Sequence, residues 1–170
     1  MRLAMGVCLL VTGCTSGWMP PDIQSNETLN TLGAAGYQRL CSAFEGYVRD
    51  EYSSNYFVQA ICLYEGVTTT TSAIECGDAV NACTETMPPA AESLLSAILA
   101  QASCSTIGIN PTGCAATVAQ VKACLDAIED QLKSLEFAAT CAVAGQQVDD
   151  NWWRIPLPAA CESLRTICPP

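Results

Sequence analysis

The chain of 170 residues contains no histidine and few cations. Without imidazole, it cannot build Ser-His-Asp or Cys-His catalytic arrangements or any zinc site with a histidine ligand. Its 7 Lys and Arg stand against 17 Asp and Glu. A surface this acidic repels phosphate backbones, so we expect no nucleic-acid partner. The sequence also lacks Gly-x-Ser-x-Gly, Ser-x-x-Lys and glycine-rich phosphate loops, so it indicates neither an enzyme nor a cofactor.

The first thirteen residues have the order of an export signal. Arg2 precedes an apolar run over 3–11, which is too short to cross a bilayer because a spanning helix needs about 20 apolar residues. The run leads into Val11-Thr12-Gly13-Cys14, which resembles the lipobox of bacterial lipoproteins. By that resemblance, residues 1–13 are a cleaved signal peptide and Cys14 carries acyl chains on its sulfur and amine. The alternative is an ordinary secretory signal and a soluble exported protein.

This resemblance implies a location in the cell envelope, with the acyl chains of Cys14 inserted in a membrane. Two or more chains, at about 0.8 kcal/mol per buried methylene, anchor a protein stably. Thr15, not Asp, follows Cys14, which by analogy with enterobacterial sorting favours the outer membrane. Removal of Arg2 leaves 6 cations and 17 acids, a net charge of −11. The acyl chains are therefore the expected membrane contact.

Apart from Cys14, ten cysteines follow the signal. They are Cys41, Cys62, Cys76, Cys83, Cys104, Cys114, Cys124, Cys141, Cys161 and Cys168. An even number in an exported chain predicts five structural disulfides. No Cys-x-x-Cys occurs, so thiol-redox or metal-handling chemistry is an alternative that the spacing does not favour.

The spacing of the cysteines limits their pairing. Cys76 and Cys83 are seven residues apart, as are Cys161 and Cys168, which is about 10 Å along a helix. A disulfide needs Cα atoms within about 7 Å, so we expect each of these four thiols to have a partner elsewhere.

Two pairings can be proposed from the spacing. Cys62 and Cys76 lie equally far from a turn near Thr69 and could face one another. Cys104 and Cys114 could close the loop between them.

Apolar residues recur at three- and four-residue steps over most of the chain. This pattern predicts an all-α domain over 34–170, built as a bundle of about five to seven short helices. Residues 14–33 show little periodicity and several turn-forming residues, which predicts a lipidated tether. Trp18 and Met19, close to the anchor, are expected at the lipid headgroup boundary.

Local signals predict several helix ends. Ser72 with Glu75, and Thr117 with Gln120, fit capping boxes that begin helices. Gly66 is expected to close a short helix whose apolar residues run from Phe57 to Tyr64.

Two other helix boundaries follow from proline and from the apolar stripe. Pro158 is expected to begin the last helix. The strongest apolar stripe runs over 118–132, and the sequence leaves open whether that helix ends near Lys133 or continues to Gly145.

The segment Asp149-Asp150-Asn151-Trp152-Trp153-Arg154 is the most site-like stretch. Its carboxylates and indoles could bind a glycan or a cation, although calcium loops need alternating oxygens that it lacks. The alternative is that the indoles cover one end of the bundle and the charges lie in water.

Two pairs of adjacent acids fall on predicted helices. Asp50-Glu51 and Glu129-Asp130 are neighbours in sequence, and adjacent helical positions point about 100° apart. We therefore expect solvated helix faces and no acid/base pair.

The lipobox, the tether and cysteines on helices, as in Cys114-Ala-Ala-Thr-Val-Ala-Gln-Val-Lys-Ala-Cys124, resemble the cysteine-rich lipoproteins of Gram-negative bacteria. This resemblance is one of type and carries no activity with it. We expect an anchored envelope protein with a non-enzymatic binding or structural role, whose partner is an envelope protein or a glycan.

Overall fold

The computed structural model describes residues 17–52 and 56–168, so Cys14 and its lipobox-like stretch lie outside the described residues. Seven α-helices and one 3-10 helix, with no strand, occur within these ranges, which confirms the all-α prediction. The helices are α1 (Leu29–Tyr52), α2 (Val58–Thr69), α3 (Ala73–Thr86), α4 (Pro89–Ala100), α5 (Cys104–Ile107), α6 (Val118–Lys133) and α7 (Ala159–Ile167), with the 3-10 helix η1 at Cys141–Val143. In the described part of the chain, none of these helices has the length and apolar character needed to cross a membrane.

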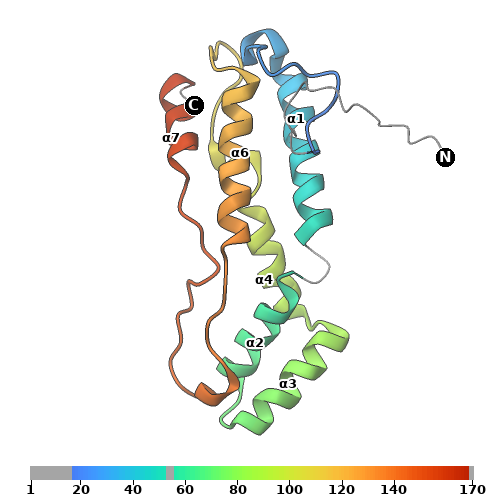
Figure 1. The fold of residues 1–170 in the computed structure, drawn as a ribbon, viewed down its shortest axis with the longest axis vertical. Coiled ribbons are helices and arrows are strands. Elements are labelled where there is room, and N and C mark those ends of the chain that lie inside the picture. Colours follow the sequence, from blue (N-terminus) through green and yellow to red (C-terminus); the bar gives the residue numbers. More distant parts are fainter. Residues whose placement is uncertain (1–16, 53–55, 169–170) are drawn as a thin grey trace, which may run out of the picture.

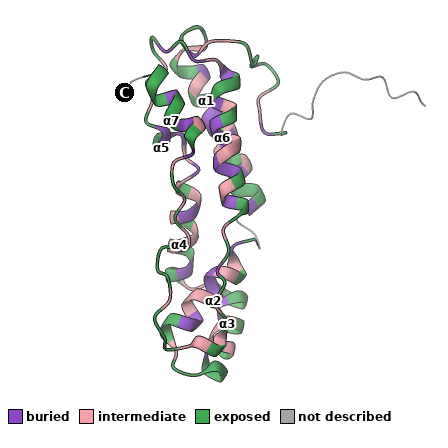
Figure 2. Cartoon of the chain, turned by 60° about the vertical axis from the view of Figure 1, so that its left-hand side comes forward, coloured by how far each residue is buried: buried purple, intermediate pink, exposed green. Residues whose placement is uncertain are grey.

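The helices form an elongated molecule with two ends of different make-up (Figure 1). Helices α1, α6 and α7 lie side by side in the upper half, while the α2–α3 hairpin forms the lower end. Helix α4 joins them, contacting both α1 and α2. Figure 2 shows the buried residues along the facing sides of these helices. A large core runs from the upper half along α4 into α2 and α3, and a second, smaller core around Val67, Cys76 and Phe137 lies at the lower end.

Short-range signals predicted several helix boundaries correctly. Thr117 Oγ1 accepts from the Gln120 amide at 3.4 Å, and the Gln120 side chain accepts from the Thr117 amide at 2.8 Å. This capping box starts α6, which ends at Lys133 and does not continue to Gly145. Ser72 likewise caps α3 by accepting from the Glu75 amide at 3.3 Å.

Gly66 does not close α2, as predicted, but lies inside it. A Cβ atom at this position would lie 2.9 Å from Val80 Cγ2 and 3.2 Å from the Cys76 carbonyl oxygen. The missing side chain therefore lets α3 approach α2 closely. The glycine serves helix packing, and α2 runs on to Thr69.

Residues 17–28, the described part of the expected tether, pack against the helices. Trp18 is only 5% exposed, and its ring centre lies 5.0 Å from that of Phe44. The Leu29 amide donates to the Ala116 carbonyl at 2.8 Å. The folded domain thus includes residues 17–33, and Trp18 lies in the core instead of being free for lipid headgroups. The apolar residues of 17–28 do not recur at three- and four-residue steps, so helical periodicity could not reveal their burial.

Five disulfides pair all ten of the cysteines predicted to be structural. They are Cys41–Cys104, Cys62–Cys83, Cys76–Cys141, Cys114–Cys168 and Cys124–Cys161, with Cα–Cα distances from 4.7 to 5.6 Å. Cys76 and Cys83 bond to different partners, as do Cys161 and Cys168, which confirms the prediction from helical rise.

The Cys62–Cys76 pairing was wrong. Equal distance from the turn places two residues at the same level along a helical hairpin. It does not determine the direction in which their side chains point. Cys76 lies against Gly66 of α2 and bonds to η1 through Cys141, while Cys62 bonds to Cys83.

The Cys104–Cys114 pairing was also wrong. Helix α5 begins at Cys104, which bonds to Cys41 of α1. Cys114 instead joins the chain before α6 to Cys168, which follows α7.

Candidate functional site

The predicted site segment, Asp149–Arg154, lies on the chain that returns from the lower end toward α7. The two tryptophans are half-buried, and the charged residues are exposed. Trp152 packs on Phe137 and Tyr64, with ring centres 5.3 and 6.1 Å away. Its indole thus contributes to the lower core, which agrees with the alternative that the indoles cover an end of the bundle.

The polar groups of this segment bond mainly to one another and to their neighbours. Asp149 accepts from the Asn151 amide at 2.8 Å, and Asp150 accepts from the Tyr64 hydroxyl at 3.0 Å. The Arg154 guanidinium lies 5.1 Å from the centre of the Trp153 ring. Burial, together with the hydrogen bond to Asp150, raises the pKa of Tyr64. These contacts hold the segment in place, and its binding of a glycan or cation stays a prediction.

No metal centre is assembled in the part of the chain that the structure describes: no three His, Cys, Asp or Glu side chains gather there in a way that could hold an ion. The sequence-predicted residues Asp149 and Asp150 are each tied to a separate partner.

Glu129 on α6 is a buried carboxylate that the sequence analysis placed in solvent. It is 4% exposed and accepts hydrogen bonds from the hydroxyls of Tyr47 at 2.6 Å and Tyr52 at 3.2 Å. Lys133, one turn further along, forms an ion pair with it at 2.8 Å. The prediction was therefore wrong for Glu129. Its position four residues after buried Leu125 was the signal that could have revealed this.

The three donors keep Glu129 ionised. Burial alone would raise its pKa, but the hydrogen bonds from Lys133, Tyr47 and Tyr52 outweigh burial and hold the pKa below its ordinary value of 4.5. The hydrogen bond between Tyr47 and Glu129, together with burial, raises the pKa of Tyr47 to about 12. The group therefore links α1 to α6 through one charged oxygen, Glu129 Oε1, which all three donors contact.

A groove of about 550 Å³ runs between α1 and the segment 103–111. Tyr37, Cys41 and Glu45 follow one another at four-residue steps along its α1 wall. Glu45 accepts from the Ser103 hydroxyl at 2.8 Å and from the Cys104 amide at 3.1 Å. The Cys41–Cys104 disulfide joins the two walls. No motif in the sequence indicated this groove.

Tyr37 supplies the unusual polar group of the groove. Its hydroxyl is buried and has no hydrogen-bond partner among the described residues. Burial, with a contribution from the charge of Glu45, raises the pKa of Tyr37 to about 12. The hydroxyl therefore stays protonated at neutral pH and can donate to an acceptor that reaches it.

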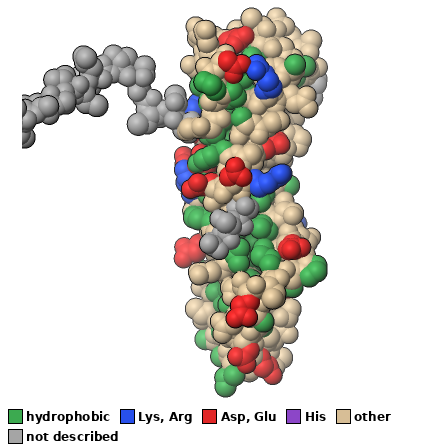
Figure 3. Space-filling model, turned by 90° about the vertical axis from the view of Figure 1, so that its right-hand side faces the viewer, with side chains coloured by type: hydrophobic (Ala, Val, Ile, Leu, Met, Phe, Trp, Pro, Cys, Tyr) green, Lys and Arg blue, Asp and Glu red, His purple; other side chains and the backbone are tan. Residues whose placement is uncertain are grey.

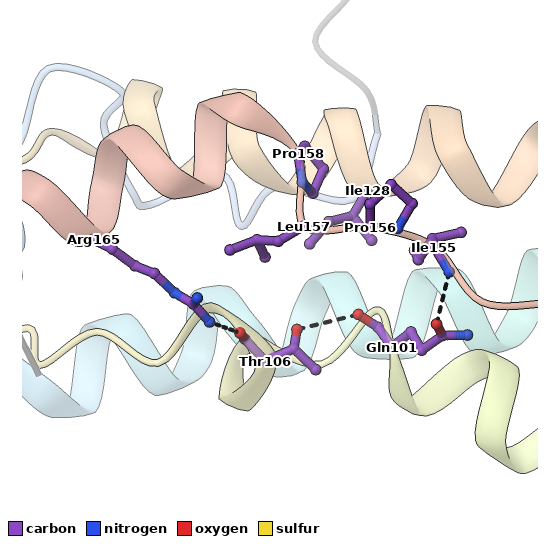
Figure 4. A pocket seen from close by; sticks show the side chains of 8 residues that line it. All are labelled: Gln101, Thr106, Ile128, Ile155, Pro156, Leu157, Pro158 and Arg165. Atoms are coloured by element: carbon purple, nitrogen blue, oxygen red, sulfur yellow. Dashed lines mark hydrogen bonds between the residues drawn. The ribbon is translucent and has the colours of Figure 1, made fainter.

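A smaller pocket, of about 170 Å³, lies where the returning chain crosses the α4–α5 junction (Figure 4). Arg165 donates to the carbonyls of Thr106 and Ile107 at 2.7 and 2.6 Å. Gln101 accepts from the Ile155 amide at 3.0 Å. The polar groups at the rim thus fasten α7 and the chain before it onto the domain.

Comparisons with protein-family models, with curated proteins and with solved structures found no match for this chain.

Proposed function

We propose that this protein is a lipid-anchored lipoprotein of the cell envelope with a non-enzymatic binding or structural role. The observation that carries the proposal is the disulfide framework, which pairs all ten cysteines of the domain. Disulfides persist in oxidising compartments outside the cytoplasm. Five of them therefore support an exported domain, and the lipobox-like Val11–Cys14 supports a membrane anchor.

The framework suits a rigid scaffold. Every α-helix except α4 contains at least one disulfide-bonded cysteine. Each such bond typically stabilises a fold by about 2–4 kcal/mol, mainly by restricting the unfolded chain. A domain restrained in this way presents a fixed surface.

The groove along α1 is the best-supported place for binding. Its volume of about 550 Å³ falls within the range of roughly 300–1,000 Å³ common for ligand pockets. Glu45 offers a carboxylate there, and the unpartnered Tyr37 hydroxyl lies buried in the wall. A partner that presents both acceptors and donors, as an envelope glycan or a protein surface does, would suit these groups.

Mass spectrometry of the protein extracted from membranes tests the anchor. The expected result is a mature chain that begins at Cys14, carries acyl groups and contains five disulfides without a free thiol. A Cys14→Ser variant should remain unacylated and leave the membrane fraction. A soluble mature protein with a different first residue contradicts the anchor, and free thiols in the domain favour the redox alternative.

Chemical cross-linking in intact envelopes tests the binding role. A Ser42→Arg variant fills the groove from an exposed position on α1, and Ser163→Arg places the same side chain on the exposed face of α7. We expect Ser42→Arg to lose cross-linked partners that the native protein and Ser163→Arg retain. Turnover of an envelope substrate by the pure domain would contradict the non-enzymatic role.

A further inference from the structure

The chain is fixed to the domain very soon after the proposed lipid anchor. Trp18 is four residues beyond Cys14 and is buried between α1 and α6. Its ring packs on Phe44, and its indole N–H donates to Asp126 at 3.3 Å. The Lys122 ammonium lies 5.7 Å from the centre of the Trp18 ring. Trp18 is thus held by a ring contact, by a cation over its ring and by a hydrogen bond from its nitrogen.

This docking limits how far the anchor can lie from the domain. Four residues span at most about 14 Å even when fully extended. The Cα atom of Cys14 therefore lies within about 14 Å of the Cα atom of Trp18, whatever path the chain takes between them. A free tether over 14–33 would have reached about 70 Å by the same measure. The short connection restricts which side of the domain can face the bilayer.

The flank around Trp18 is electrically balanced. Asp22 pairs with Arg39 at 2.7 Å, and Asp126 pairs with Lys122 at 2.5 Å. Between Trp18 and Asp22 the chain is Met19-Pro20-Pro21, which carries no charge. The carboxylates of Asp22 and Asp126 on this flank are therefore each paired with a cation when the flank approaches anionic headgroups.

The opposite end of the molecule is uniformly acidic. Residues 58–86, which form α2 and α3, contain four Asp and Glu but no Lys or Arg. Glu75, Asp78 and Glu85 are exposed on α3. On the face shown in Figure 3, acidic side chains (red) lie over the lower end without Lys or Arg (blue), whereas the upper half carries both kinds. Anionic lipid repels such an end within about a Debye length, roughly 8 Å at physiological salt.

From the docked Trp18 and this charge distribution we infer that the domain rests on the bilayer by its Trp18 flank. Figure 1 shows the α2–α3 hairpin at the far end of the molecule, and in this orientation the hairpin is directed away from the membrane. The partner of the flank is an anionic lipid surface. This inference rests on the proposed acyl anchor at Cys14, and it adds a fixed orientation to that proposal.

Energy transfer from two labelled sites tests the orientation. A donor dye is placed on an unnatural azido side chain at Gln24, exposed beside the flank, or at Asn81, exposed on α3. The full acylated protein is reconstituted into phosphatidylethanolamine/phosphatidylglycerol vesicles that contain an acceptor-labelled lipid. We expect higher transfer from Gln24 than from Asn81. A twenty-residue Gly-Ser insert between Ser16 and Gly17, with an average span of about 25 Å, should abolish the difference.

The mass of the acylated protein, measured on the same samples, distinguishes failure of the proposed anchor from failure of the proposed orientation. An unacylated Cys14 overturns the anchor and the orientation together. An acylated Cys14 with equal transfer from both sites, or with higher transfer from Asn81, overturns the orientation alone. A difference that survives the insert overturns the role of the short connection.

Discussion

The Tyr47 hydroxyl of α1 donates to the Glu129 carboxylate of α6 across 2.6 Å. These two residues are 82 positions apart in the chain, and their bond crosses the interface between two long helices of the upper half. Tyr52 and Lys133 complete the set of donors, so the carboxylate is buried but not isolated.

We predict that Glu129→Gln lowers the free energy of unfolding by about 2 kcal/mol at neutral pH, because it weakens charge-assisted hydrogen bonds. The folded-state pKa of Glu129 is depressed. Its stabilisation is therefore complete above the ordinary pKa of 4.5 and is lost as the pH falls through the folded-state value. Urea unfolding from pH 7 down to about pH 3 should show the native protein and the variant converging.

The neighbouring Asp130 provides the control for this measurement. Its side chain is 77% exposed, so Asp130→Asn should change stability by no more than about 0.5 kcal/mol. A constant difference between the native protein and Glu129→Gln over the whole pH range would contradict the ionised state of Glu129.

Gly66→Ala should destabilise the α2–α3 hairpin by about 1–3 kcal/mol, because the new methyl group meets Val80 and the Cys76 backbone. Gly46 in α1 is the matched control, since nothing lies within 4 Å of its would-be Cβ. Gly46→Ala should stabilise the protein by about 0.5–1 kcal/mol through helix propensity. Thermal unfolding of both variants gives the comparison, and equal shifts would contradict the close packing at Gly66.

The disulfide pairing can be checked by peptide mapping without reduction. The map should contain Cys62–Cys83 and Cys76–Cys141 and should lack a Cys62–Cys76 peptide. Replacing both Cys76 and Cys141 by Ser should lower stability by about 4 kcal/mol, because the bond closes a loop of 65 residues. Faster amide exchange over 136–152 should accompany this loss.

The two tryptophans of the candidate segment should respond differently. Trp152 packs on Phe137 and Tyr64, so Trp152→Ala should cost about 3 kcal/mol of stability. Trp153→Ala should cost less, about 1–2 kcal/mol, because that ring packs only partly against the large core, although its loss also removes the indole hydrogen bond to the Asp150 carbonyl and the contact with Arg154. Urea unfolding measures both values. If the segment is a glycan site, Trp153→Ala instead abolishes the fluorescence response of the protein to oligosaccharides.

The features predicted correctly from the sequence are those set by near neighbours. The capping box of α6 needs only Thr117 and Gln120, three residues apart. The rule that Cys76 and Cys83 cannot bond to each other needs only the helical rise.

The features missed depend on how distant segments meet. Trp18 is buried because α1 and α6 leave a space that it fills, and nothing in its local sequence shows that space. The partner of Cys62 depends on the rotation of α3 about its own axis, which the spacing around a turn does not determine. The α1 groove arises from the Cys41–Cys104 crossing and so required the pairing to be known.

If the chain is exported as proposed, the placement of the disulfides also orders the steps of its maturation. Cys62 and Cys83 lie 21 residues apart, so the lower hairpin can be oxidised soon after it emerges from the translocation pore. Cys114 and Cys124 both bond to partners at α7, so they must wait as thiols until that helix has crossed. During that interval they are open to mispairing. Cys76 of the lower hairpin waits longest, because its partner Cys141 follows 65 residues later, so the Cys76–Cys141 bond is the one for which a disulfide isomerase would matter most.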